Sequence, residues 1–542
     1  MLAQKNAMTQ IRHTLAMVSF TPDPTPFHHW QITKPAARSS RGIVTSQVRD
    51  ATEAGVAILE AGGNAVDAAV GTAFALAVVE PWNSGLGGIG FALVHGASEP
   101  RAHSVHYGPV APRRLSPADF ELTGGQPTNH IFPWPGVKDD ANAHGPLSFC
   151  LPPAVAGYGL MLERWGTMPL REILQPAIAL ARRGATLDWY TTLMLAESAP
   201  ILRRYAASSQ MFLRDGLPPT APTQGTPGFL PLGAMASTLE QLALAGWRDF
   251  YVGAVAERVI ADIRDLGGVI DAEELATYRP EVREPLSVPW RCSVVQLSSG
   301  LTAGPTLADV FARLKKSHPQ ADPAPTPSWY ADVGTAMKDA YRERLAKAGD
   351  EDPKEKGCTS HIGVVDSSGS MVSMTNTLLS SLGSKVVLPG TGFVMNNGVL
   401  WFDPRPGQVN SIAGGKRPLT NMCPAIVQRD GRPTIAVGAA GGRRIMAAVG
   451  QLIMFVNDFD MDVQDAGHWP RIDVSGPDRV TADRRLSDDV LDALRQAGDT
   501  EVVDWSVMPF NFARAGIIEN RDGMSASGLS DPYAPWSAAL AP

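Results

Sequence analysis

The residues with the clearest chemical potential lie together at one junction of the chain. A charged stretch, residues 349–357, leads into Cys358, Thr359 and His361, and the apolar run Ile362–Val365 follows. Such a charged stretch is typical of a solvated linker, and the run after it predicts a strand. A thiol or hydroxyl between a linker and a strand becomes a nucleophile when a base lies beside it.

Two nucleophiles are open at this point. Cys358 could act with His361 as its base. The hydroxyl of Thr359 is a poor nucleophile unless a base activates it. Most Thr residues at strand starts only cap or pack, so Thr359 by itself is a weak signal. The decision between the two therefore depends on the rest of the chain.

Groups of hydroxyl, amide and glycine residues recur on both sides of this junction. Downstream they are Thr375-Asn376-Thr377, Pro389-Gly390-Thr391-Gly392, Asn396-Asn397, Gly415-Lys416-Arg417-Pro418-Leu419 and Gly441-Gly442. Upstream they are Gly62-Gly63-Asn64-Ala65-Val66-Asp67-Ala68-Ala69 and Glu80-Pro81 followed by Ser84-Gly85-Leu86-Gly87-Gly88. In this order and spacing, from about residue 40 to 475, the chain resembles the γ-glutamyltransferase family of N-terminal-nucleophile hydrolases.

The resemblance implies a fold and a processing step. The fold is a four-layer αββα sandwich, of the α/β class, formed by both processed fragments as one composite domain. The implied cut lies between Cys358 and Thr359. It gives a helix-rich large subunit, 41–358, after an irregular N-terminal arm, 1–40, and a small subunit, 359–542, that begins with the nucleophile. Cys358 is then the residue left behind by the cut.

The resemblance also assigns the catalytic roles. The freed amine of Thr359, with an unperturbed pKa of about 7.7–8.0, takes the hydroxyl proton as the oxygen attacks an acyl carbon. Thr377 matches the residue that hydrogen-bonds the nucleophile. Gly441 and Gly442 match the pair that offers backbone N–H groups to the oxyanion, and loss of one such donor typically slows a reaction about 10²–10³-fold.

The positions that hold a glutamyl head group in this family differ here. Gly108 stands where the family has an Arg for the α-carboxylate, and Arg113 and Arg114 lie only nearby. Trp401, preceded by Leu400, replaces a carboxylate. Leu379 replaces an Asn, and Thr420-Asn421 replace a Ser pair. We therefore expect an apolar acyl pocket formed by Leu379, Trp401, Thr420 and Asn421.

A cation from elsewhere could still bind a carboxylate in this pocket. Arg443 and Arg444 directly follow the glycine pair, and Arg405 and Arg417 lie in the same part of the chain. Arg443 is the first candidate. Each of these residues could equally form a surface or structural salt bridge.

These observations predict a self-processing threonine amidohydrolase or acyltransferase whose amide substrate is not a standard γ-glutamyl compound. One alternative is a true γ-glutamyltransferase or glutathione hydrolase with an altered head-group pocket. Another is an unprocessed scaffold without activity. The expected partners are a small-molecule amide or peptide-like substrate and the two subunits of one precursor. No cofactor or metal is expected, and a homo-oligomer stays open.

Composition and charge argue against other functional classes and indicate a compartment. The chain has 542 residues and a net charge of −7, which disfavours nucleic-acid binding. Its longest apolar run, Ala68–Val79, is too short for a membrane span. Four cysteines far apart suit a reducing compartment, so we expect a cytoplasmic protein, with the periplasm left open. Asp458–Asp462 begins like a calcium loop but lacks the later Gly and Glu.

The elements that must position the site follow from local patterns. Asn64 is expected to cap a buried helix that runs to Val79, and a strand is expected at Phe91–Val94. Further helices are predicted at Val155–Arg164, Leu170–Arg183 and Trp329–Ala348, and strands at Ile362–Val365, Met371–Met374 and Val386–Leu388. The glycine loop 85–90 lies between a helix and a strand, the reverse of a dinucleotide fingerprint. Close backbone packing is its expected role.

Overall fold

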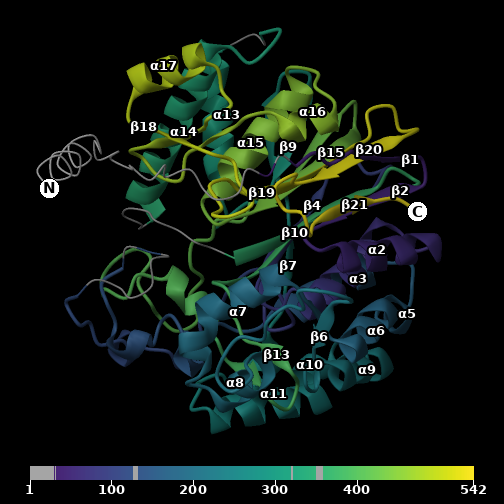
Figure 1. The fold of residues 1–542 in the computed structure, drawn as a ribbon, viewed down its shortest axis with the longest axis vertical. Helices are drawn as coiled ribbons and strands as arrows, with labels where there is room; N and C mark the ends of the chain where they lie inside the picture. The colour runs from purple at the N-terminus through teal and green to yellow at the C-terminus, as the bar shows by residue number, and fades with distance from the viewer. Residues whose placement is uncertain (1–29, 31, 126–131, 133, 319–321, 349–357) are drawn as a thin grey trace, which may run out of the picture.

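Two antiparallel sheets of seven strands each face one another at the centre of the protein (Figure 1). The computed structural model describes residues 30, 32–125, 132, 134–318, 322–348 and 358–542. The first sheet has the order β1 (Ala37–Ser39), β20 (Ala526–Ser530), β19 (Arg514–Glu519), β15 (Arg432–Ala440), β14 (Ala425–Arg429), β9 (Ser293–Leu297) and β8 (Leu286–Trp290). The second has the order β21 (Ala538–Leu540), β2 (Gly42–Ser46), β10 (Cys358–Asp366), β11 (Met371–Leu379), β3 (Ile89–His95), β4 (His103–Tyr107) and β7 (Glu281–Arg283).

Helices cover the outer face of each sheet. On the first sheet these are α13 (Gly304–Ser317) and α15 (Arg444–Asn457), with α14 (Pro327–Ala348) packed against α13. On the second they are α2 (Arg49–Glu60) and α3 (Ala65–Val79). The architecture is therefore the predicted four-layer αββα sandwich (Figure 1).

The remaining elements surround these four layers. The helices are α4 (Ala154–Trp165), α5 (Leu170–Ile173), α6 (Gln175–Arg183), α7 (Trp189–Leu202), α8 (Ala206–Phe212), α9 (Met235–Ala245), α10 (Asp249–Val252), α11 (Ala254–Asp265), α12 (Ala272–Thr277), α16 (Val463–His468) and α17 (Asp488–Ala497). Short sheets pair β5 (Ala185–Leu187) with β6 (Gly228–Leu230), β12 (Val387–Leu388) with β13 (Phe393–Val394), and β16 (Ile472–Asp473), β17 (Val480–Asp483) and β18 (Thr500–Val503) with one another. Short 3-10 turns include η4 (Gly398–Trp401).

Strands from both sides of Cys358 alternate within the two large sheets. Seven of their fourteen strands precede Cys358, among them β2 and β3, which flank the pair β10 and β11. The sequence-based picture of a helix-rich front and a strand-rich back is therefore incomplete. The front strands are short, three to seven residues, and long helical segments separate them.

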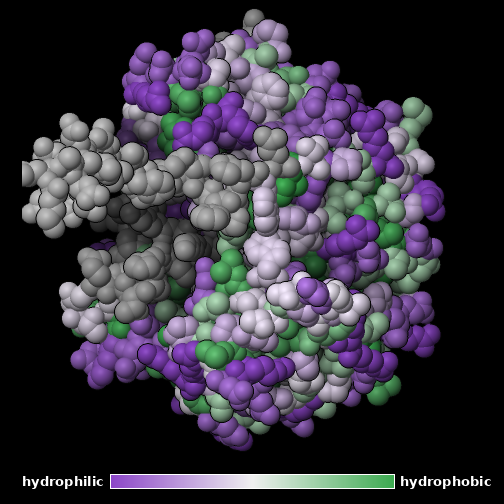
Figure 2. Space-filling model, in the orientation of Figure 1, coloured by the Kyte–Doolittle hydropathy of each residue, from purple (hydrophilic) through white to green (hydrophobic). Residues whose placement is uncertain are grey.

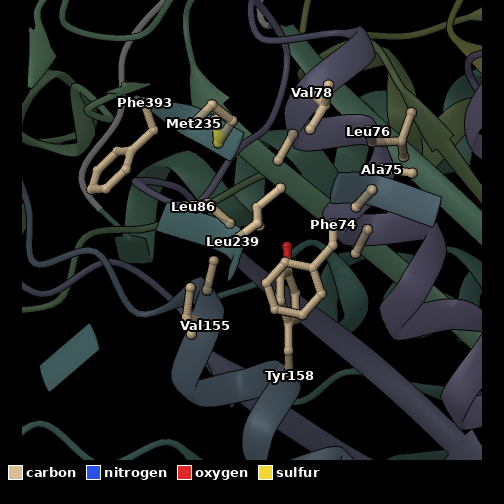
Figure 3. Packing of buried hydrophobic residues seen from close by; sticks show 14 of the residues in the cluster. Phe74, Ala75, Leu76, Val78, Leu86, Val155, Tyr158, Met235, Leu239 and Phe393 are labelled. Carbon is tan, nitrogen blue, oxygen red and sulfur yellow. The ribbon is translucent and has the colours of Figure 1, made fainter. Parts of the chain in front are cut away.

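Helix α3 packs under the second sheet, and it is the buried, Asn64-capped helix that the sequence predicts. Asn64 accepts hydrogen bonds from the N–H groups of Val66 and Asp67, and the Asp67 carboxylate accepts one from the N–H of Asn64, which completes a capping box. Every residue of the helix is buried. Phe74 packs edge-on against Tyr158 of α4 with ring centroids 5.2 Å apart (Figure 3). The predicted helix Leu170–Arg183, in contrast, divides at Leu174 into α5 and α6.

The glycine loop after α3 lets backbones approach closely, as expected. A Cβ at Gly87 would lie 2.4 Å from the Val394 carbonyl oxygen, and one at Gly90 would lie 2.6 Å from that of Thr375. Side chains at these positions would push the loop away from β11 and β13. The loop therefore serves packing beside the strand that carries Thr377.

The space between the sheets is apolar except for a few buried polar groups. His361 of β10 lies there beneath Gly438 of β15, and burial lowers its pKa to about 3. Its Nδ1 lies 3.2 Å from the Thr375 hydroxyl. His361 is thus a buried packing residue of the sandwich. The side chain of Cys358 lies outside the described set.

The outer surface is mixed in character. On the face shown in Figure 2, apolar side chains occur in small groups among polar ones. Within the part of the chain that the structure describes, no helix is both long and apolar enough to cross a bilayer.

The close packing of Gly438 against His361 allows a test of how the two sheets pack. A Cβ at Gly438 would lie 2.2 Å from the His361 ring. We expect Gly438→Ala to lower the free energy of unfolding by about 1–3 kcal/mol, because both sheets must separate to admit the methyl group. Gly228→Ala is the control, since a Cβ there meets its nearest neighbour at 3.7 Å. Denaturant unfolding of both variants is the measurement, and equal stabilities would contradict the packing argument.

Candidate active site

The register of β10 against β11 brings the two predicted catalytic threonines together. From Val365 opposite Met371 the pairing is regular to Ser360 opposite Asn376. Thr359, the next residue of β10, meets both Thr377 and Leu378 of β11 at a shift in this register. The strand pairing therefore brings the two threonines close together, and both line the same pocket.

The shift in register amounts to one residue. Cys358 pairs with Leu379, so β11 has one extra residue at this point. Leu379 has φ +87°, a left-handed conformation that costs a bulky side chain energy. The Thr377 hydroxyl oxygen accepts the Leu379 N–H at 2.8 Å and closes the bulge.

A pocket opens over these threonines. The described residues that line it are Thr359, Thr377, Leu379, Trp401, Asn421, Met422, Gly442 and Ile445, and none of them carries a charge. The space between its walls is about 260 Å³ when the open solvent at its mouth is included, so its enclosed part is small. Met422 and Ile445 are pocket residues that sequence reasoning missed, although each adjoins a predicted segment.

The glycine pair lies at a turn between a strand and a helix. Gly441 and Gly442 follow β15 and precede α15, with φ +146° and +61°. Glycine adopts both values without strain, and the first is hardly accessible to any other residue. Gly442 lines the pocket, whereas Gly441 is not among the described lining residues. The positive end of the α15 helix dipole favours negative charge at this point.

An apolar cluster forms the wall where the family has charged head-group ligands. Leu379, Trp401 and Met422 pack with neighbours that include Phe91 and Trp134. Gly108 follows β4 beside Phe91, and a Cβ on it would lie 2.5 Å from the Phe91 ring. Phe91 thus occupies the space into which a side chain at position 108 would extend. The absence of an Arg at position 108 and the apolar wall are therefore linked, because Phe91 fills the space that the Arg side chain would need.

Thr420 and Asn421 differ in their placement. Asn421 lines the pocket. The Thr420 hydroxyl instead donates to the Leu301 carbonyl at 2.9 Å, and Thr420 is not among the described lining residues. Arg344 of α14 donates to the Thr420 carbonyl at 2.7 Å and to Asn421 Oδ1 at 3.3 Å. Arg344 therefore orients the pocket amide from behind, a role that its sequence position gives no sign of.

Three of the arginines considered as carboxylate ligands form ion pairs within the protein. Arg405 pairs with Asp403, Arg417 with Glu281 and Arg444 with Asp473. Arg113 and Arg114 are exposed. Arg443 is buried, its carbonyl accepts the Tyr341 hydroxyl at 2.6 Å, and it is not among the described residues that line the pocket.

Comparison with known proteins agrees with this geometry. The family model described as gamma-glutamyltranspeptidase matches residues 51–356 and 351–541. The chain belongs to this family. It is therefore an enzyme of the amide hydrolase or acyl transferase type, and its family is the one that the motifs predict.

Individual relatives of the gamma-glutamyltranspeptidase family divide between two names. The chain is 31% identical to acylase ACY 1 proenzyme of Pseudomonas sp. strain SE83, over 82% of this chain and 84% of the relative. It is 28% identical to glutathione hydrolase proenzyme of Escherichia coli K12, over 85% and 86%. The fold is similar to that of cephalosporin acylase from Bacillus halodurans, with a TM-score of 0.80 and 24% identity over 96% of this chain and 99% of that one.

The hydrogen bond that closes the β11 bulge provides a test of the site. Thr377→Val keeps the shape of the side chain but removes the acceptor for the Leu379 N–H. A buried donor without a partner costs about 1–3 kcal/mol, and we expect both stability and turnover to fall. Thr377→Ser, which keeps the hydroxyl, is the control and should retain most of both. Urea unfolding and single-turnover rates measure them, and wild-type values in Thr377→Val would contradict the assignment.

Proposed function

We propose that this enzyme cuts its own chain between Cys358 and Thr359 and then hydrolyses or transfers small apolar acyl groups from amides. The observation that carries the proposal is the uncharged pocket in which Thr359, Thr377 and Gly442 meet. The large and small fragments would remain assembled, because their strands alternate in both sheets. The word proenzyme in the names of the acylase and glutathione hydrolase relatives supports the cut.

The chemistry follows from the geometry. Thr359 Oγ1 attacks the acyl carbon, and the free amine of the same residue takes its proton. The carbonyl oxygen of the substrate gains negative charge and accepts hydrogen bonds from N–H groups of the Gly441-Gly442 turn, at the positive end of α15. Collapse breaks the C–N bond, and the amine leaves with the proton. Water or an acceptor amine then attacks the Thr359 ester and frees the enzyme.

The same groups explain the cut before the mature enzyme exists. Thr359 Oγ1 would attack the Cys358 carbonyl carbon, the C–N bond would break, and the Thr359 nitrogen would receive the hydroxyl proton and become the free amine; water then hydrolyses the ester that has formed. Thr377 lies across the strand pair to hydrogen-bond the hydroxyl oxygen. The peptide at residues 358–359 has a register shift on its partner strand, which leaves its backbone less constrained than a regular ladder would.

The apolar wall supports an apolar acyl group over a glutamyl one. A zwitterionic head brings a carboxylate and an ammonium group, and no charged side chain is present among the described lining residues to balance either. Burying such charges unpaired is costly. The 31% identity to a protein named acylase points the same way. A true glutathione hydrolase is the competing outcome, because the Escherichia coli relative carries that name.

Self-cleavage is tested on a denaturing gel. The 57.7 kDa chain should give fragments of about 38 and 20 kDa, in proportion to residue number, and a new N-terminus at Thr359 by mass analysis. Thr359→Ala should remain at full length and be inactive. Cys358→Ser should still be cut, since only its carbonyl takes part. An uncut wild type would support a scaffold, and loss of all activity in a cut Cys358→Ser protein would support the thiol.

Specificity is tested by comparing kcat/KM for anilides that differ only in the acyl group. Short aliphatic and phenylacetyl groups should exceed γ-glutamyl by about 10–100-fold, because the pocket offers contact but no charge partner. Trp401→Asp should lower apolar turnover. Gly108→Arg should help a γ-glutamyl substrate only together with Phe91→Ala, which makes room for the new side chain. A native preference for the γ-glutamyl anilide would favour the glutathione hydrolase alternative.

A further inference from the structure

A buried carboxyl group lies behind the two threonines, on the side of the sheet away from the pocket. Glu80 is the C-cap residue of α3 and is fully buried. Its Oε2 accepts the Ser360 hydroxyl at 2.7 Å, and its Oε1 accepts the side-chain amide of Asn83 at 2.6 Å. Ser84 donates in turn to the Ser360 hydroxyl at 3.2 Å.

These two contacts reach both strands of the site. Ser360 follows Thr359 directly on β10. The backbone carbonyl of Asn83 accepts the N–H of Leu378 at 2.9 Å, and Leu378 is part of the β11 bulge. Trp82, in the same turn, accepts the N–H of Leu382 at 2.8 Å. One carboxyl group therefore connects the nucleophile strand to the bulge at which Thr377 meets Thr359.

We propose that Glu80, in its ionised form, is the positioning residue that holds Thr359 and Thr377 in register for the acyl-transfer reaction. The inference rests on the proposed function of Thr359. Glu80 itself does not line the pocket, where the described residues are those named above. Its action is on the strands that present the reacting groups.

The direction of the hydrogen bonds favours the ionised form. Both carboxyl oxygens act as acceptors, and Ser84, Ser360 and Glu80 form a chain in which each hydroxyl donates toward the carboxylate. A protonated carboxyl would have to donate from one oxygen and so reverse or break one of these contacts. Protonation of Glu80 should therefore loosen either Ser360 or the Asn83 turn.

The electrostatic setting brings this protonation into the working range of the enzyme. Burial raises the pKa of Glu80 to about 7, while the charge of Arg514 on β19 and the hydrogen bonds from Ser360 and Asn83 lower it in part. Arg514 donates to the Tyr190 hydroxyl at 2.8 Å and stacks over Phe510. These are the groups that act on Glu80 from the loop after α3, from β10 and from β19.

The raised pKa of Glu80 also means that the folded protein is less stable when Glu80 is ionised, which is the form proposed to be active. Because the folded-state pKa lies above the ordinary value for Glu, the folded chain binds the proton more tightly than the unfolded chain. The contribution of Glu80 to stability is thus fully present below about pH 4.5, and it is lost as the pH rises through about 7. Activity and stability should change in opposite directions over this interval.

The test compares pH profiles of kcat for wild type and Glu80→Gln on an apolar acyl anilide. Gln keeps the shape but offers only one acceptor oxygen, so one donor loses its partner. We expect kcat at pH 8 to fall about 10–100-fold, as for small misplacements of reacting groups, with KM within about twofold. The rise of wild-type kcat near pH 7 should be absent, so that kcat increases only with the Thr359 amine, whose unperturbed pKa is about 7.7–8.0. Asp458→Asn is the matched control, a buried carboxyl bound to Trp290 far from the site, and should keep the wild-type profile.

Two further measurements distinguish a failure of the positioning role of Glu80 from a failure of the proposed function. Ser360→Ala removes one donor and should lower kcat in the same direction even if Glu80→Gln folds poorly. In the inactive Thr359→Ala background, the fall in unfolding free energy between pH 4.5 and 7 should be reduced by Glu80→Gln. Wild-type kcat and pH profile in both Glu80→Gln and Ser360→Ala would overturn the positioning role. An active Thr359→Ala protein would instead overturn the proposed function.

Discussion

The site depends on one change of register between two neighbouring strands. Up to Ser360 and Asn376 the pairing of β10 with β11 is regular, and one residue later it slips. Thr359 and Thr377 lie at this slip, and Leu379, just beyond it, lines the same pocket with left-handed backbone. The helix, loop and carboxyl group behind the sheet all contact this point. Their packing is the reason that an irregularity, otherwise a weakness in a sheet, persists in one form.

Around this point the protein separates charge from the reacting groups. Arg405 and Arg417 are paired with carboxylates, and the pocket wall includes Leu379, Trp401 and Met422, which pack with Phe91. Under the proposed function, the backbone dipoles at Gly442 would act strongly on a developing oxyanion in such a low-dielectric setting. Selection of the acyl group then depends mainly on shape. A site of this kind can exchange its substrate class by changing a few wall residues while the threonines stay in place.

The parts of this structure that the sequence predicts are those with local causes. Asn64 and Asp67 cap a continuous apolar run, so α3 could be predicted with its start and end. Thr359, Thr377 and the glycine pair carry family spacing, and the structure brings Thr359 and Thr377 close together. The contribution of Phe91 to the space beside Gly108, and that of Arg344 behind Asn421, depend on contacts between distant segments. Phe91–Val94 was predicted and lies within β3, but the other front strands were missed because strands of three to five residues have too short a pattern to recognise. Glu80 was visible as an acid between apolar residues, but only its partners reveal what it does.

The alternation of strands from the two sides of Cys358 bears on how the protein can be made and exchanged. β10 has β2 on one side and β11 on the other, and β11 in turn pairs with β3. Neither half has a hydrophobic core that it could close alone, so each would expose long sheet edges to aggregation if synthesised separately. The two halves are thus not independent folding units. Gene rearrangement could not pair this large half with a foreign small half unless every strand boundary matched, so the two must evolve as one unit.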